Sequence, residues 1–443
     1  MLKRKMMDYL KNWKATKKKE CLLVRGARQV GKSFIVEAFG QECYESYVCL
    51  DFIKRPELKE IFAGSLDADD IYLRLSLFLR DFRLVEGDTL IFLDEIQECP
   101  QARTALKYLA LDGRCDVVAS GSLLGISYLQ GGGDASSIPV GYERAVEMHP
   151  LDFEEYLWAR GFSSDVVAVL EGYFERLEPV PQAVNASMMS YLREYLAIGG
   201  MPEVVQAFVD GNSFSVAHDA QGKLVEAYLD DIARYASPSE RVKARACYLS
   251  LPSQLAKENT KFKYSTVEKG GTARKFGGSV DWLEGADMVL RCRSVVTPSF
   301  PLVAYEDGSR FRLYANDTGL LLYRYGFDMK AAVVGNTLTG PMKGGLYENL
   351  VASMLAKNGV PLRYWTSTDG NAEIEFLVDW DGAVVPVEVK ASRGGTASLN
   401  RLLASEDVKL GYKLVDGNVG VDGKKATLPL YMAMFLFRRQ EGA

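Results

Sequence analysis

The first 150 residues alternate short apolar runs with stretches of helical spacing. The apolar runs are CLLVRG, SYVCLDF, DTLIFLDE, CDVVASGS and RAVEMHPL. Each run has the length and aliphatic content of a buried strand, and the stretches between them place apolar residues at helical intervals. Strands that alternate with helices in this way predict an α/β fold with a parallel sheet.

The pattern changes twice further along the chain. Helical spacing dominates residues 152–240, in FEEYLWAR, VVAVLEGYFERL, MMSYLREYLAI and KLVEAYLDDIARYA. Strand-like runs return after residue 299, in FRLYAND, PLRYWTST, EIEFLVDWDG, AVVPVEVKAS and LGYKLVDG. A chain of 443 residues is too long for one ordinary core, so several domains are expected. The pattern predicts four segments, with the boundaries 1–151, 152–240, 241–300 and 301–443.

Composition is that of a soluble globular protein, with 48% apolar and 25% charged residues. The formal net charge of −5 excludes a uniformly basic nucleic-acid binder. The seven cysteines are scattered, without the close pairs of a metal knuckle, which suits a reducing cytoplasm. No apolar run approaches the length needed to span a membrane. We therefore expect a cytoplasmic protein without a membrane partner.

Residues 26–33 read GARQVGKS and fit the pattern G-x-x-x-x-G-K-[ST]. They follow a predicted strand and precede a predicted helix, which is the order that a phosphate-binding loop needs. The glycines let backbone N–H groups turn toward an anion, and the helix N-terminus adds partial positive charge. Lys32 is expected near the β- and γ-phosphates of ATP and Ser33 on Mg²⁺. The residues expected around the nucleotide are Gly26, Ala27, Arg28, Gln29, Val30, Gly31, Lys32, Ser33 and Phe34.

A carboxylate pair follows the predicted strand in DTLIFLDEIQE, residues 88–98. Asp94 at the strand tip suits the Mg²⁺ hydration shell, and Glu95 suits a base that polarises the attacking water. Ser120 or Ser122, at the end of CDVVASGS, either touches the γ-phosphate or the water, or caps the next helix.

Hydrolysis in many such ATPases also needs an arginine. Arg144 in VGYERAVEMHP is the candidate; the alternative is a surface ion pair with Glu143 or Glu147.

A second constellation of charged residues lies in EIEFLVDWDGAVVPVEVKAS, residues 373–392. Glu388 and Lys390 are two apart on a predicted strand, so they share a face. That face suits a second divalent metal between Glu375 and Glu388, with Lys390 near a phosphate and Glu348 as a further ligand. Glu-x-Lys pairs on strands are also ordinary salt-bridge partners, so the spacing leaves both readings open.

Residues 254–293 carry a modest basic excess, with eight Lys and Arg against five acids. The predicted order is helix, turn, Gly-flanked basic helix and strand. That order suits a winged helix whose cationic side chains contact the phosphates of double-stranded DNA. Winged helices also bind proteins, so a protein partner is the alternative.

Several stretches together resemble one family of prokaryotic AAA-type ATPases of the P-loop, ASCE class. They are GARQVGKS, LIFLDEIQECP, ASGSLLG, IPVGYERAVEMHPLDFEEYLWA, REYLAIGGMPEVV and LYANDTGLL, and they extend over most of the chain. The resemblance implies an ATPase core at 1–151, a helical lid at 152–240, a winged helix at 241–300 and a nuclease-like domain at 301–443.

The segment with Glu375, Glu388 and Lys390 resembles the PD-(D/E)XK nuclease core, a restriction-endonuclease-like α/β fold. The first acid of that pattern is normally Asp, and Glu375 is longer by one methylene, which puts a tight metal site in doubt.

Three functions follow as hypotheses. The first is an ATPase whose nucleotide state controls C-terminal modules that bind DNA. The second is an ATP-regulated, metal-dependent DNA nuclease. The third is an ATP-switched signalling or scaffold protein, oligomeric or bound to a protein partner, without nucleic acid.

Overall fold

The computed structural model describes residues 2–16, 20–122, 141–257, 260–391 and 395–438. Its contacts divide the chain into two compact units. The first comprises Lys3–Pro150 with Gly285–Asp287, and the second comprises Leu151–Glu284 with Met288–Ala443. Among the described residues, no helix combines the length and the apolar character that crossing a lipid bilayer requires.

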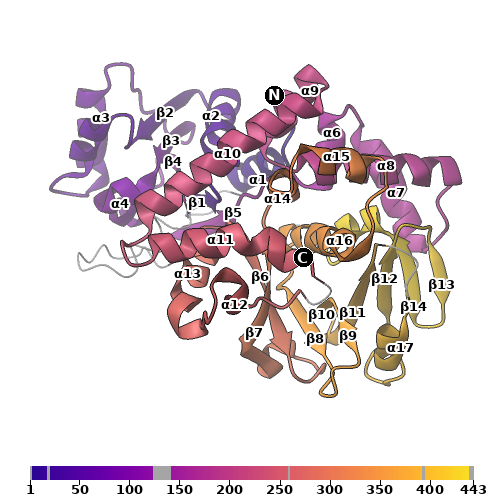
Figure 1. Ribbon diagram of the computed structural model, residues 1–443. Helices are drawn as coiled ribbons and strands as arrows, with labels where there is room; N and C mark the ends of the chain where they lie inside the picture. The colour runs from indigo at the N-terminus through magenta and orange to yellow at the C-terminus, as the bar shows by residue number, and fades with distance from the viewer. Residues whose placement is uncertain (1, 17–19, 123–140, 258–259, 392–394, 439–443) are drawn as a thin grey trace. The chain divides into compact units, whose positions relative to one another are not determined.

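The first unit is built on a five-stranded parallel sheet with the strand order β2-β3-β4-β1-β5 (Figure 1). The strands are β1 (Cys21–Gly26), β2 (Ser46–Asp51), β3 (Thr89–Asp94), β4 (Asp116–Ser122) and β5 (Glu143–Glu147). The helices are α1 (Lys5–Ala15), α2 (Lys32–Cys43), α3 (Ala68–Phe78) and α4 (Pro100–Asp112), with short 3₁₀ turns η1 (Pro56–Phe62) and η2 (Ile96–Glu98). The predicted parallel α/β sheet is confirmed.

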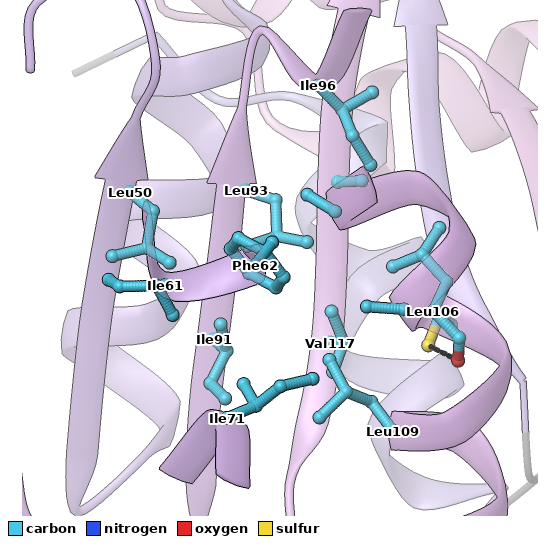
Figure 2. Packing of buried hydrophobic residues seen from close by; sticks show 14 of the residues in the cluster. Leu50, Ile61, Phe62, Ile71, Ile91, Leu93, Ile96, Leu106, Leu109 and Val117 are labelled. Atoms are coloured by element: carbon cyan, nitrogen blue, oxygen red, sulfur yellow. Dashed lines mark hydrogen bonds between the residues drawn. The ribbon is translucent and has the colours of Figure 1, made fainter. Parts of the chain in front are cut away.

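Alternating side chains of the central strands fill two cores, one on each face of this sheet. On one face Ile91, Leu93 and Val117 pack with Leu106 and Leu109 of α4 (Figure 2). The opposite face packs its apolar residues against α1 and α2; its strand residues are Leu22, Val24, Leu90, Phe92 and Val118. Because both faces are covered, the strands read as continuous apolar runs in the sequence.

The second unit begins with a helical region. Its helices are α6 (Phe153–Ala159), α7 (Ser164–Arg176), α8 (Gln182–Ile198), α9 (Pro202–Gly211), α10 (Phe214–Tyr235), α11 (Arg241–Leu255), α12 (Tyr264–Val267) and α13 (Ala273–Gly285). A capping box starts α6: the Asp152 side chain accepts from the Glu155 N–H, and the Glu155 side chain accepts from the Asp152 N–H.

Two further sheets complete the second unit, in the orders β7-β6-β8-β9 and β10-β11-β12-β14-β13. Their strands are β6 (Val289–Val295), β7 (Glu306–Ala315), β8 (Arg363–Thr366), β9 (Glu373–Ile374), β10 (Phe376–Trp380), β11 (Ala383–Lys390), β12 (Gly411–Val415), β13 (Gly420–Asp422) and β14 (Lys425–Pro429). The remaining elements are η3 (Leu302–Tyr305), α14 (Thr318–Tyr323), α15 (Phe327–Val334), α16 (Gly340–Lys357), α17 (Ala397–Leu403) and η4 (Leu430–Phe435).

The stretches REYLAIGGMPEVV and LYANDTGLL contact each other inside this unit. The buried Asp317 caps α14 by accepting from the Leu320 N–H, and it also accepts from the Gly200 N–H at 2.6 Å. Gly199 has a left-handed backbone (φ 81°), and a Cβ atom there would lie 2.2 Å from the Asp317 carboxylate. Glycine at position 199 is therefore needed for this close approach.

Candidate functional site

The segment between β1 and α2 is a tight loop that leads directly into the helix. Gly31 has a left-handed backbone (φ 93°) and directly precedes α2. Glycine adopts that conformation without strain, so the loop can turn sharply into the helix. A Cβ atom on Gly26 would lie 2.1 Å from the carbonyl oxygen of Met148, so this position has no room for a side chain. The first N–H groups of α2 lack partners within the helix, which suits them to phosphate.

Lys32 is buried at the start of α2, over the same loop. Its Nζ donates to the carbonyl oxygens of Gly26 (3.1 Å) and Ala27 (2.8 Å). Burial lowers the pKa of Lys32, and the carboxylates of Glu95 and Asp94 oppose this shift. A polyphosphate would supply the negative charge that this buried ammonium group attracts.

The other predicted loop residues have separate roles in the structure. Ala27 and Val30 are buried in the core beneath α2. Gln29 has a left-handed backbone (φ 64°), which helps the loop to curl. Phe34 lies in the first turn of α2, beyond the loop, and its side chain is 59% exposed.

Three side chains with oxygen atoms meet beside the loop, namely Ser33, Asp94 and Ser120. The Ser33 hydroxyl donates to Asp94 Oδ1 at 3.0 Å, and the Ser120 hydroxyl donates to the same oxygen. They meet because β3 and β4 are adjacent and parallel, so their carboxyl ends share one edge of the sheet. A hydroxyl, a carboxylate and water are the hard ligands that Mg²⁺ prefers, so Ser33 and Asp94 fit a hydrated ion.

Glu95 directly follows β3 with a left-handed backbone (φ 54°). Burial raises the pKa of Glu95, while a hydrogen bond from Gln97 and the charge of Lys32 oppose the shift. A carboxylate with a raised pKa near a phosphate loop suits a general base.

Arg144 does not join this site within its own chain. It lies on β5 opposite Leu22, near the start of β1, and its Nε donates to Glu20 at 2.8 Å. The loop begins at Gly26, about 13 Å further along the strand at ~3.3 Å per residue. From the sequence, Glu143 and Glu147 are the alternative partners of Arg144. The Nε atom pairs with Glu20 instead. Ser122 ends β4, and its side chain lies outside the described part of the chain.

The four residues of the predicted nuclease site converge in the second unit. Lys390 Nζ donates to Glu375 Oε1 at 3.0 Å and lies 3.4 Å from Glu388 Oε1. Glu375 and Lys390 line a cavity of about 440 Å³ together with Glu348. Burial raises the pKa of Glu375 to about 7, with Lys390 opposing the shift. Burial likewise raises the pKa of Glu388.

Arg312 on β7 neutralises the other acids of this cleft. It is fully buried and forms ion pairs with Glu348 and Glu373. Glu348 also accepts from Tyr314 (2.7 Å) and Thr260 (3.2 Å), so one of its oxygens already has three donors. Within the described residues, no group of three or more His, Cys, Asp or Glu side chains is arranged to hold a metal ion.

Comparison with known protein families gives matches in three parts of the chain. Residues 18–157 match an AAA domain family. This match supports a P-loop ATPase in the first unit, with ATP binding and hydrolysis at the loop. Two families described only as domains of unknown function match residues 189–331 (DUF8612) and 343–431 (DUF4143).

Individual relatives are distant. Uncharacterized proteins of Mycobacterium tuberculosis and Mycobacterium bovis are each 32% identical over 139 residues, which is 31% of this chain and 29% of theirs. Among solved structures, a Walker-type ATPase of Pyrococcus abyssi is 14% identical, with a TM-score of 0.41 over 73% of this chain and 96% of that one. A signal transduction ATPase with a tetratricopeptide repeat sensor from Pyrococcus horikoshii is 12% identical, with a TM-score of 0.27 over 81% of this chain and 45% of that one.

Three residues of these sites are not part of the motifs identified in the sequence. Gln97 stands within LDEIQ, in which only the two acids belong to the ATPase motif. Arg312 interrupts the apolar run FRLYA, and a charge inside a buried strand is a usable signal for a buried ion pair. Glu373 stands two residues before Glu375 on β9, and Glu375 lies at the bend between β9 and β10.

Proposed function

We propose that this chain binds and hydrolyses ATP in its first unit and that the nucleotide state controls how the second unit engages duplex DNA. The observation that carries the proposal is the convergence of Lys32, Ser33, Asp94 and Glu95 around one loop. Mg²⁺, when bound, would neutralise charge on the phosphates. The Lys32 ammonium holds the β- and γ-phosphates, and Glu95 takes a proton from the attacking water.

The order of elements after α10 supports the DNA-binding part. Helices α11, α12 and α13 precede the antiparallel strands β6 and β7, which is the order of a winged helix. Arg274 on α13 is exposed, whereas Arg291 forms ion pairs with Asp281 and Glu284. We assign phosphate contact to α13 through the exposed Arg274, whereas Lys275 on the same helix is paired with Glu268 at 2.6 Å.

Replacing Lys32 by Met should lower the affinity for ATP by at least tenfold and abolish hydrolysis. The reason is that a charge-assisted contact contributes on the order of 1.5–3 kcal/mol. Binding is measured with a fluorescent ATP analogue and turnover by phosphate release, each with and without duplex DNA. The matched control is Lys54→Met, because Lys54 is exposed after β2. Turnover by the wild type that ignores DNA would favour a protein partner for the winged-helix segment.

A second candidate function is metal-dependent DNA cleavage by the second unit. The observation that favours it is Glu388 Oε2, which is buried without a hydrogen-bond partner beside Glu375 and Lys390. Mg²⁺ is often held by only one or two carboxylates with water and substrate phosphate, so Glu375 and Glu388 fit that ligand set. A bound ion would supply charge for the scissile phosphate, and Lys390 would move from the two carboxylates toward that phosphate.

Incubation with duplex DNA and Mn²⁺ or Mg²⁺ should then give cleavage products on a gel, and Lys390→Ala should remove them. Lys409→Ala is the control, because Lys409 is exposed on the loop before β12. Intact DNA with the wild type under both metals would reject this function and leave the ion pairs of the cleft as structural contacts.

A further inference from the structure

The two polar atoms of the Gln97 side-chain amide differ in their hydrogen bonding. Its Nε2 donates to Glu95 Oε2, while its Oε1 is buried and has no hydrogen-bond partner. The orientation of the amide follows from chemistry, because an ionised carboxylate only accepts hydrogen bonds and the NH₂ group must face it. The described structure therefore presents a fixed, buried acceptor beside the proposed general base.

Such an acceptor is uncommon, because most buried polar side-chain atoms in proteins have a partner. Gln97 lies on η2, which begins one residue after the end of β3, and Cys99 alone separates η2 from α4. The backbone of Glu95 is held in a left-handed turn at the same point. Both side chains are thus carried by one rigid corner next to Asp94.

We propose that Gln97 is a second water-binding catalytic residue: Oε1 accepts a hydrogen bond from the attacking water while Nε2 holds Glu95 in place. The inference rests on the proposed ATP hydrolysis. A water molecule has two hydrogens, so it can donate one to Glu95 and one to Gln97. Its lone pair then has a fixed direction toward the γ-phosphorus.

The reaction step balances without a further reactant. The bond between the water oxygen and the γ-phosphorus forms as the bond from that phosphorus to the β–γ bridging oxygen breaks. ADP leaves with the electron pair of the broken bond, and the proton of the water passes to Glu95. Gln97 exchanges no proton and acts by direction alone.

The test is kcat for the wild type, Gln97→Met and Gln97→Glu, with thermal unfolding and binding of a fluorescent ATP analogue measured beside it. Gln97→Met has no amide, so it should bind the analogue and unfold as the wild type does while kcat falls by about 10²-fold. Gln97→Glu keeps an acceptor oxygen but loses the donor to Glu95, so its kcat should also fall while binding of the analogue is kept. Gln101→Met is the matched control, since Gln101 is exposed in the first turn of α4 and should change none of the three quantities.

A purely structural role predicts a different result: a lower unfolding temperature and weaker binding of the analogue together with the loss of kcat. Wild-type kcat in both folded variants would overturn the role of Gln97 while leaving ATP hydrolysis in place. A wild type that binds the analogue but releases no phosphate would overturn both the role of Gln97 and the proposed hydrolysis.

Discussion

Glu95→Gln should bind ATP with wild-type affinity and hydrolyse it about 10²–10⁴-fold more slowly. The substitution keeps the size and hydrogen-bonding shape of the side chain but removes the group that accepts a proton from water. Lys32, Ser33 and Asp94 remain in place, so the contacts to nucleotide and Mg²⁺ are preserved. Phosphate release measured with binding of a fluorescent ATP analogue separates these two effects.

Glu98→Gln provides the matched control for this prediction. Glu98 lies three residues further on in η2, with its side chain 36% exposed and 3.7 Å from Lys59. Its charge is on the surface, so its loss should leave turnover unchanged. Hydrolysis by Glu95→Gln at the wild-type rate would show that another group accepts the proton and that the assignment of the catalytic carboxylate is wrong.

The sequence predicts the nucleotide loop well because the necessary information is local. Gly26, Gly31 and Lys32 lie within seven consecutive residues, and their roles depend on the backbone of that short segment. The parallel sheet is equally legible, since β1, β3 and β4 are buried on both faces and appear as uninterrupted apolar runs.

Arg144 illustrates information that the sequence does not carry. The sequence identifies Arg144 only as an arginine within VGYERAVEMHP that could assist hydrolysis. The register that pairs Arg144 with Leu22 rather than with a residue near Gly26 arises from tertiary packing of β5 on β1. A strand pairing of this kind decides which end of the sheet a side chain reaches, and no local pattern encodes it.

The start of α16 was equally hard to predict. Helical spacing of apolar residues is clear only in YENLVASMLAK, whereas the helix begins at Gly340. Glycine and proline in GPMKGG lower helix propensity, so the first two turns do not look helical. Gly345 is required by packing instead, because a Cβ atom there would lie 1.9 Å from the carbonyl oxygen of Leu255 on α11.

Arg312→Met should destabilise the second unit by about 3–5 kcal/mol, because it leaves buried carboxylates without their counter-charge. Glu348 is the more sensitive partner, since its side chain is 10% exposed whereas that of Glu373 is 33% exposed. The guanidinium also lies 4.4 Å from the ring centre of Tyr364, a contact that Met replaces only in part. Hydrogen–deuterium exchange of β7, β8 and α16 measures the free energy of local opening in this unit.

Two further variants serve as controls for this prediction. Arg310→Met lies two residues away on β7, where the side chain is 67% exposed, and should cost less than about 1 kcal/mol. Arg312→Met combined with Glu348→Gln should recover much of the lost stability, because removing both members of a buried ion pair is often close to neutral. If the single variant exchanges no faster than Arg310→Met, the buried carboxylates do not need the charge of Arg312, because they protonate or find other partners. The ion pairs of Arg312 would then not be what stabilises the acids of this cleft.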